Sequence, residues 1–219
     1  FSFLDDAGIT KKRKLTSFGE KIIEMGINTE ATWALMLCNL VDSAPFRWYV
    51  ENIPFDQFYE AAQLDLDMEE ATKKARGEFW NSFKVILGSN EIFQQIGLGR
   101  PDITSKTNKN GDVKKTMNYL QRVSWENPDA RVILYSLYKF AEKCGGYYQF
   151  SLSTLLDDSI ERDGISPTRI FGLNYDTMVP ILNGLSVNYS DFISASFSLG
   201  LDTISLREDK FSQDVLTIF

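Results

Sequence analysis

The chain has 219 residues, of which 43% are hydrophobic and 13% aromatic, and this composition excludes a disordered chain. Histidine is absent, which excludes hydrolases built on a histidine base and zinc sites built on imidazole. The formal net charge of −7 argues against a nucleic-acid binder with a uniformly basic surface, although basic residues are concentrated in some segments.

The sequence also indicates a location. It contains no secretory signal segment and no apolar run near the roughly 20 residues needed to cross a bilayer. Its two cysteines, Cys38 and Cys144, provide no disulfide framework, which favours a reducing compartment, although one bridge between them is left open. We therefore expect a cytoplasmic protein without a membrane partner. Because the chain starts on Phe1 rather than methionine, we also expect it to be part of a longer protein.

The first 23 residues are predicted to contain the end of a helix, at 1–8, followed by a basic turn. The turn carries four consecutive cations, which are Lys11, Lys12, Arg13 and Lys14. The order of an apolar segment, a basic hairpin and the Leu-Thr-x-x-Gly segment at 15–19 resembles the tail of a winged-helix domain. The cations fit a solvated turn better than a wing that contacts phosphates, which is the alternative.

Residues 1–100 are predicted to form a helical domain. A helix capped by Thr29 spans 30–43 and ends before Pro45, and residues 46–53 fit either a strand or another helix. Further helices are predicted at 55–63, 70–87 and 90–96.

Four acids lie close together in the sequence, and they are Asp65, Asp67, Glu69 and Glu70. Carboxylates spaced like Asp65 and Asp67 could hold Mg²⁺. Asp67 and Glu70 also fit a capping pair at the start of the helix 70–87, and we favour this interpretation. The charged residues at 157–163 are interpreted as a solvated loop between helices. We therefore assign no catalytic, cofactor-binding or metal-binding residue.

Residues 101–126 are predicted to form a polar linker or exposed loop with a turn at 110–112. The segment is locally basic, through Lys106, Lys109, Lys114, Lys115 and Arg122. A solvated flexible loop is the favoured interpretation, and contact with phosphates is the alternative.

Residues 127–219 are predicted to form a winged-helix-like domain. Asn127 is expected to cap a helix over 129–143, followed by a short strand at 147–150. Three short helices are then expected, at 151–156, 168–173 and 177–185, with Thr177 as the cap of the last. A hairpin is expected from the alternating runs 192–197 and 202–206.

This module has few side chains that could bind DNA. In its predicted recognition helix only Asn183 could contact a base, and the helix contains no lysine or arginine. The hairpin adds Arg207 and Lys210, which Glu208 and Asp209 offset in charge. We therefore expect the module to pack against another domain or subunit rather than to recognise DNA sequence.

Several segments together resemble a known family. They are Leu134–Glu142, Ile165–Leu173, Leu201–Leu206 and Asp214–Leu216. They resemble the C-terminal region of bacterial phosphoadenosine phosphosulfate reductase-like proteins, and also the domain family of unknown function that accompanies them. Both are associated with DNA sulfur modification and phage defence. The family's chemistry resides in a nucleotide-binding domain with a Ser-Gly-rich loop and cysteines, which this chain lacks, so the resemblance implies a non-catalytic remainder of an enzyme.

The sequence therefore predicts an α+β protein that is mainly helical with a small amount of β structure. We expect a non-catalytic accessory region without cofactors. Its partner would be the catalytic domain of the same or a neighbouring protein, another protein, or DNA contacted through basic loops. The alternative is a free-standing winged-helix DNA-binding regulator.

Overall fold

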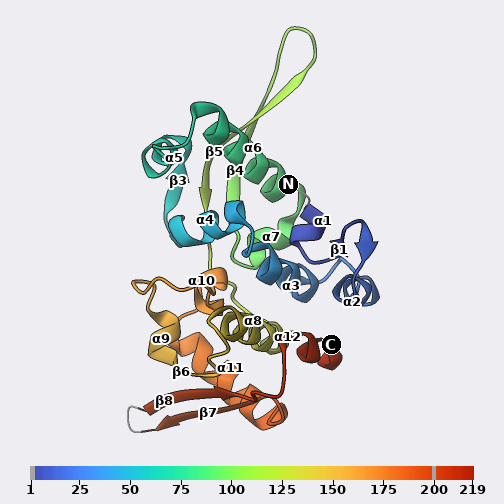
Figure 1. Ribbon diagram of the computed structural model, residues 1–219. Helices are drawn as coiled ribbons and strands as arrows, with labels where there is room; N and C mark the ends of the chain where they lie inside the picture. The colour runs from blue at the N-terminus through green and yellow to red at the C-terminus, as the bar shows by residue number, and fades with distance from the viewer. Residues whose placement is uncertain (1–2, 199–200) are drawn as a thin grey trace.

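The computed structural model describes residues 3–198 and 201–219 and has the expected α+β composition (Figure 1). The helices before residue 100 are α1 (Phe3–Asp6), α2 (Ser17–Met25), α3 (Glu30–Leu40), α4 (Ala44–Asn52), α5 (Ala61–Asp67), α6 (Lys73–Ser89) and α7 (Glu91–Gln95). Those that follow residue 126 are α8 (Ala130–Lys143), α9 (Leu152–Leu156), α10 (Pro167–Phe171), α11 (Tyr175–Asn188) and α12 (Ser212–Val215), with a final 3-10 turn at Leu216–Ile218.

The strands form three small antiparallel sheets. The first is the hairpin of β1 (Thr10–Lys11) and β2 (Lys14–Leu15). The second has the order β3-β5-β4, from β3 (Phe58–Glu60), β4 (Arg100–Thr107) and β5 (Val113–Gln121). The third has the order β6-β8-β7, from β6 (Gln149–Ser151), β7 (Ile193–Ser198) and β8 (Leu201–Leu206).

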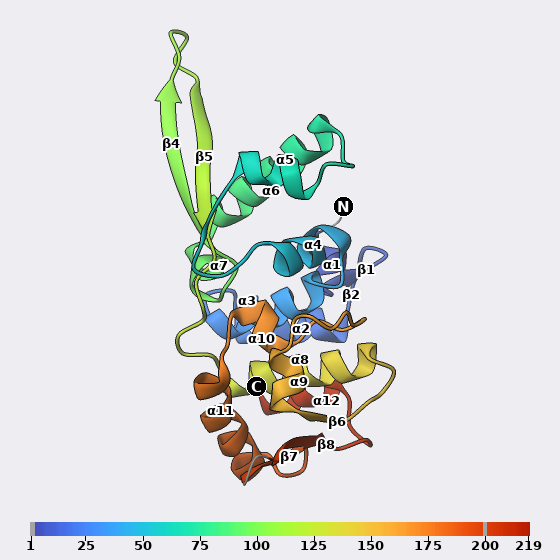
Figure 2. The ribbon, with the colours of Figure 1, turned by 90° about the vertical axis from the view of Figure 1, so that its left-hand side faces the viewer.

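The two parts of the chain stack on each other (Figures 1 and 2). The helix α3 packs against α8, and buried apolar residues from both parts form one continuous core. Polar contacts cross the same boundary, because Tyr135 Oη donates to Asn39 Oδ1 at 3.0 Å and Lys139 Nζ lies 2.9 Å from Asp42 Oδ2. At opposite ends of the molecule, the β4–β5 hairpin and the β7–β8 hairpin project from this body.

Several local predictions are confirmed. The basic turn at 11–14 is a hairpin, in which Lys12 and Arg13 have positive φ angles of 51° and 63°. Thr29 caps α3 by accepting a hydrogen bond from the main-chain N–H of Thr32. Residues 46–53 lie almost entirely in the helix α4 rather than in a strand, and the expected β7–β8 hairpin is present, with its connection at 199–200 outside the described residues.

The prediction of a linker at 101–126 was wrong, because most of this segment belongs to the β4–β5 hairpin. The predicted helix at 55–63 was also wrong at its start, since β3 pairs with residues 119–121 of β5 before α5 begins. The error at 55–63 arises because pairing between strands distant in sequence, β3 and β5, overrides local helical preference. The error at 101–126 arises because an exposed hairpin lacks the alternation of apolar and polar residues that predicts strands.

Three predicted helix starts were wrong for a different reason, which is competition between neighbouring capping residues. Asp67 ends α5, and α6 begins after Thr72, whose hydroxyl accepts from the N–H of Ala75. Asp129, rather than Asn127, caps α8 and also binds the Arg131 guanidinium. Asn174, rather than Thr177, caps α11, because its side-chain oxygen accepts from both the N–H and the hydroxyl of Thr177. Ser151 caps α9 and Ser166 caps α10.

The expected element order for 127–219 is present, as helix α8, strand β6, helices α9 to α11 and the hairpin β7–β8. The short strand β6 joins the hairpin as the third strand of its sheet, next to β8.

Candidate nucleic-acid interface

The β4–β5 hairpin extends beyond the body as an arm. Every residue from Thr104 to Thr116 is exposed, on both faces of the hairpin. The root is anchored, because Met117 and Leu120 are buried and the Trp80 indole N–H donates to the Met117 carbonyl at 3.3 Å. The turn is organised by the side chain of Asn108, whose Oδ1 accepts from the main-chain N–H groups of residues 110 and 112. We call residues 104–116 the arm (Figure 2).

Four of the lysines predicted as nucleic-acid contacts lie on this arm, and they are Lys106, Lys109, Lys114 and Lys115. In the ladder Lys106 pairs directly with Lys114, so these two ammonium groups share one face. Lys115 pairs with Ser105 on the opposite face, and Lys109 lies in the turn. The arm contains one acid, Asp112.

The lysines of the arm make no ion pair with any described residue. Like charges directly opposite each other in a ladder destabilise the strand pair, by roughly 0.2–1 kcal/mol. The Lys106–Lys114 pair therefore costs stability without an internal partner that offsets it, so the cations are available to an external anion.

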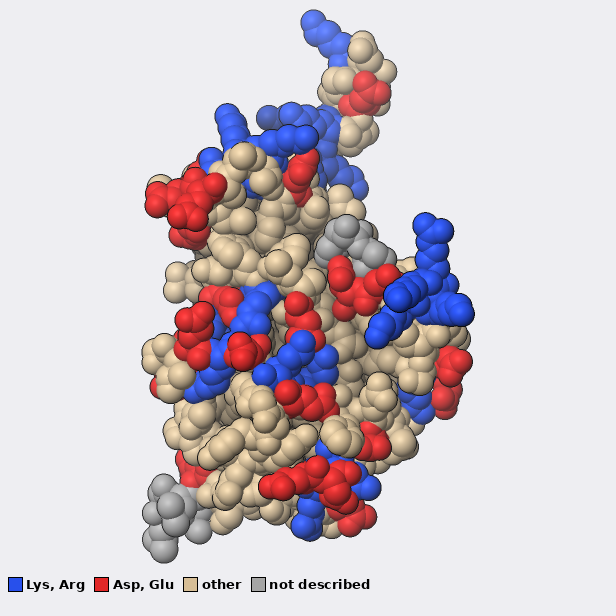
Figure 3. Space-filling model, in the orientation of Figure 1, with Lys and Arg blue, Asp and Glu red and all other residues tan. Residues whose placement is uncertain are grey.

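The helix α6 adds a cation beside the arm that was not among the predicted contacts. This is Lys84, whose Nζ donates to the Lys115 carbonyl oxygen at 3.2 Å. In Figure 3 basic side chains gather at the base of the arm and at its tip, one group of acids lies over α5, and smaller acidic patches lie among the basic side chains. The place of Lys84 beside the arm follows from the packing of the β4–β5 hairpin against α6, which the sequence did not reveal.

The second predicted basic group lies at a separate place on the surface. Lys11, Lys12, Arg13 and Lys14 project from the β1–β2 turn, away from the arm (Figure 3). All four side chains are exposed, and none forms an ion pair with a described residue. This turn is short, so it presents a compact group of positive charges rather than an extended basic ribbon.

Arg122 was predicted as a nucleic-acid contact, and this prediction was wrong because the side chain is only 1% exposed. Its guanidinium lies 3.9 Å from the centre of the Phe55 ring. It donates five hydrogen bonds of 2.9–3.1 Å to main-chain carbonyl oxygens, those of Val50, Ile53, Gly97, Arg169 and Ile170. Burial lowers the pKa of Arg122 to about 10, and this guanidinium joins the end of α4, the end of α7 and α10.

The remaining predicted contacts lie in the C-terminal part. Asn183 is exposed on α11, a helix without lysine or arginine. Arg207 is held by the Ser190 carbonyl oxygen, at 3.3 Å from Nη2, and Lys210 Nζ lies 5.8 Å from the centre of the Phe192 ring. These three residues are on a different part of the molecule from the arm and do not combine with it into one surface.

The acids between 65 and 70 are engaged by neighbouring side chains. Arg76 Nε lies 2.6 Å from Asp65 Oδ1, and the Tyr59 hydroxyl donates to Asp67. Among the described residues no three His, Cys, Asp or Glu side chains gather as a metal site. Cys38 and Cys144 are both free thiols. The described helices are all too short or too polar to span a bilayer.

Comparisons with known proteins give one similarity in fold. No protein-family model matches the chain, and no curated protein matches it. Among solved structures, the chain is similar to one described as the magnesium ion-bound crystal structure of SspB, with a TM-score of 0.63 and 14% sequence identity. The match covers 99% of this chain and 72% of that chain, and at this identity it shows a common fold.

Proposed function

We propose that this chain is a non-catalytic accessory region of a protein linked to DNA modification or phage defence, and that it contacts DNA through the arm. The observation that carries the proposal is the exposed, unpaired cation set on both faces of residues 104–116. The link to DNA modification is supported by the sequence resemblance to phosphoadenosine phosphosulfate reductase-like proteins.

The shape of the arm suits duplex DNA. The major groove of B-DNA admits a two-stranded β-ribbon, and several DNA-binding proteins use strands in this way. Lysines on both faces of such a ribbon can neutralise phosphates on either side of the groove, and phosphate neutralisation supplies most of the affinity of sequence-independent binding. Lys84 of α6, which lies beside the arm, would meet a phosphate that flanks the ribbon.

We propose a different role for the C-terminal part. Its element order and the sheet order β6-β8-β7 support a winged-helix-like module, but α11, the element in the place of a recognition helix, carries no cation. We therefore propose that this module docks a catalytic domain or another protein. The absence of cations on α11 argues against a free-standing winged-helix regulator that binds DNA by this helix.

The proposal is tested by replacing the two lysines that lie opposite each other in the ladder, with Lys106→Gln and Lys114→Gln combined in one variant. The two substitutions remove two phosphate contacts, so the slope of log K against log[salt] should become shallower by roughly 1.8. Binding is measured by fluorescence anisotropy of a labelled duplex between about 50 and 200 mM salt.

A matched control changes the net charge equally. Lys11→Gln with Lys14→Gln removes two cations from the β1–β2 turn and should leave the salt slope at the value of the unmodified protein. If both double variants weaken binding alike, the effect is one of overall charge and the arm is not the contact. Failure of the unmodified protein to bind duplex at the lowest salt would also refute the proposal.

A further inference from the structure

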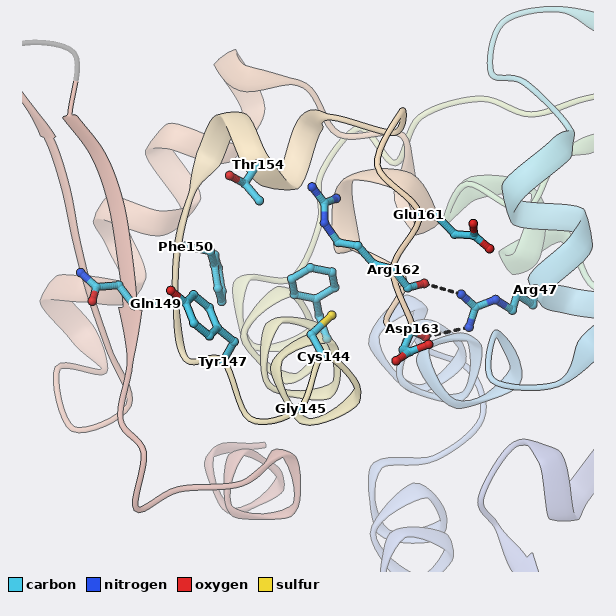
Figure 4. A pocket seen from close by; sticks show the side chains of 11 residues that line it. Arg47, Cys144, Gly145, Tyr147, Gln149, Phe150, Thr154, Glu161, Arg162 and Asp163 are labelled. Carbon is cyan, nitrogen blue, oxygen red and sulfur yellow. Dashed lines mark hydrogen bonds between the residues drawn. The ribbon is translucent and has the colours of Figure 1, made fainter.

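A cavity of about 890 Å³ is lined by residues of the C-terminal part and by Arg47 of α4. It is bounded by the end of α8, by β6, by α9 and by the loop 161–163 (Figure 4). Its volume falls in the range of about 300–1,000 Å³ that is usual for small-molecule sites. The DNA proposal above does not use it.

The loop that closes one side of the cavity is held in place from the N-terminal part. Arg47 of α4 donates to the carbonyl oxygens of Arg162 and Asp163, at 2.6 and 2.7 Å (Figure 4). The Nε of Arg47 is in turn 3.0 Å from Glu51 Oε1. The main chain at residues 162 and 163 is therefore held in place before any ligand binds, which lowers the cost of ordering a site.

Arg162 itself has an unsatisfied donor. Its Nη1 donates to the Asp157 carbonyl oxygen at 3.1 Å, but its Nη2 is buried and has no hydrogen-bond partner among the described residues. No carboxylate of the described residues lies within ion-pair distance of this guanidinium. A buried donor without an acceptor is costly, and more so on a charged group. Arg162 also lines the cavity, so a rotation of its guanidinium would bring this donor to an anionic oxygen bound there.

The same cavity presents aromatic surface. Tyr147 lies at the rim of the cavity and is 71% exposed, although large aromatic side chains usually bury most of their ring. Phe150 lines the wall and packs edge-on against Phe140, with 5.8 Å between ring centres. Glu161 and Asp163, both exposed, also line the cavity, where their two negative charges are matched by the positive charges of Arg47 and Arg162.

We propose that this cavity binds a small organic anion that carries a planar ring. The anionic oxygen accepts from Arg162 Nη2, and the ring lies against Tyr147 and Phe150. Thr154, toward which the Arg162 side chain extends in Figure 4, adds a hydroxyl to the polar side of the site.

Phenyl phosphate is a direct probe, because it combines both features in a small molecule. Its binding is measured by isothermal titration calorimetry beside two partial probes, inorganic phosphate and benzyl alcohol. The expected order is phenyl phosphate bound most tightly, with each partial probe weaker by about fivefold or more, since each lacks one of the two contacts. Equal affinity for phenyl phosphate and benzyl alcohol would overturn the role of Arg162, and no binding of phenyl phosphate would overturn the site.

Two variants locate the binding. Arg162→Gln should weaken the affinity for phenyl phosphate by about tenfold or more, because a charge-assisted hydrogen bond is lost. The control Arg207→Gln removes an arginine that also donates to a main-chain carbonyl oxygen but lies outside the cavity. It should leave the affinity for phenyl phosphate unchanged. If Arg162→Gln unfolds the protein, Tyr147→Ala decides, since this exposed ring can be removed without loss of the fold. Undiminished affinity in Tyr147→Ala, or in folded Arg162→Gln, would refute the proposal.

Discussion

Two kinds of cation in this chain look alike in sequence and differ in surroundings. Arg122 and Lys115 both lie in or beside β5, yet Arg122 is buried under Phe55 and Lys115 is exposed. Both were candidate phosphate contacts under the alternative interpretation of 101–126, since the sequence does not reveal where β5 enters the core. Leu120 and Val123 flank Arg122, but apolar neighbours alone do not predict that an arginine is enclosed by carbonyl groups.

The Arg122 environment leads to a stability prediction. Lysine has three donors where arginine has five, so Arg122→Lys should leave at least two buried carbonyl oxygens without a partner. The expected loss in the free energy of unfolding is about 2 kcal/mol or more, measured by urea denaturation. As a comparison, Lys109→Gln in the exposed turn should change it by less than about 0.5 kcal/mol. Equal effects of the two substitutions would contradict the role assigned to Arg122.

At the scale of elements, helices with a buried stripe and a capping residue were predictable, and the arm was not. The helices α3 and α8 bury one side or more, so their apolar residues recur with helical spacing. The arm is exposed on both faces, so it has no alternation of apolar and polar residues from which a strand could be predicted. Only its turn was visible, as Asn110-Gly111-Asp112.

The helix α11 gives a second prediction. With Thr177 as the expected cap, Pro180 would lie in the first turn. The helix begins at Tyr175, however, so proline occupies an interior position where its missing N–H removes a hydrogen bond of the helix. Because Pro180 is exposed, Pro180→Ala should lose little packing and raise the free energy of unfolding by about 1–3 kcal/mol. Thermal or urea unfolding measures this gain.

Pro45 offers the matched control for this substitution. It is also exposed and helical, but it is the second residue of α4, where the N–H has no partner within the helix. Pro45→Ala should therefore give no comparable gain. A stabilisation of similar size in both variants would show that chain entropy, rather than the position within the helix, determines the effect.

At the scale of the whole molecule, the buried titratable groups predict loss of stability in alkali. Burial raises the pKa of the Cys38 thiol to about 12 from its ordinary value of 9.0. It also raises the pKa of the phenols of Tyr49 and Tyr135. In the unfolded chain these groups lose protons from about pH 9 upward, whereas the folded protein retains them, so the folded state binds more protons and stability falls as pH rises.

Urea midpoints measured at about pH 8, 9 and 10 should therefore decrease in that order. The lowered pKa of Arg122 acts in the opposite direction, but only from about pH 10 upward. Cys38→Ala should make the decrease shallower, because one of the raised groups is gone. A midpoint that stays constant or rises up to about pH 10 would contradict the argument.

The position of Arg122 at the foot of the arm has a mechanical consequence. The strand β5 runs from the arm's exposed turn to Gln121, and the next side chain is fastened to both stacked parts of the body. Because the hairpin is anchored at its base, it cannot rotate freely about that point. Any force on the tip, including that of a duplex bound as proposed, is therefore transmitted to α4 and α10 together. Bending the arm at its base would first have to break the hydrogen bonds of Arg122.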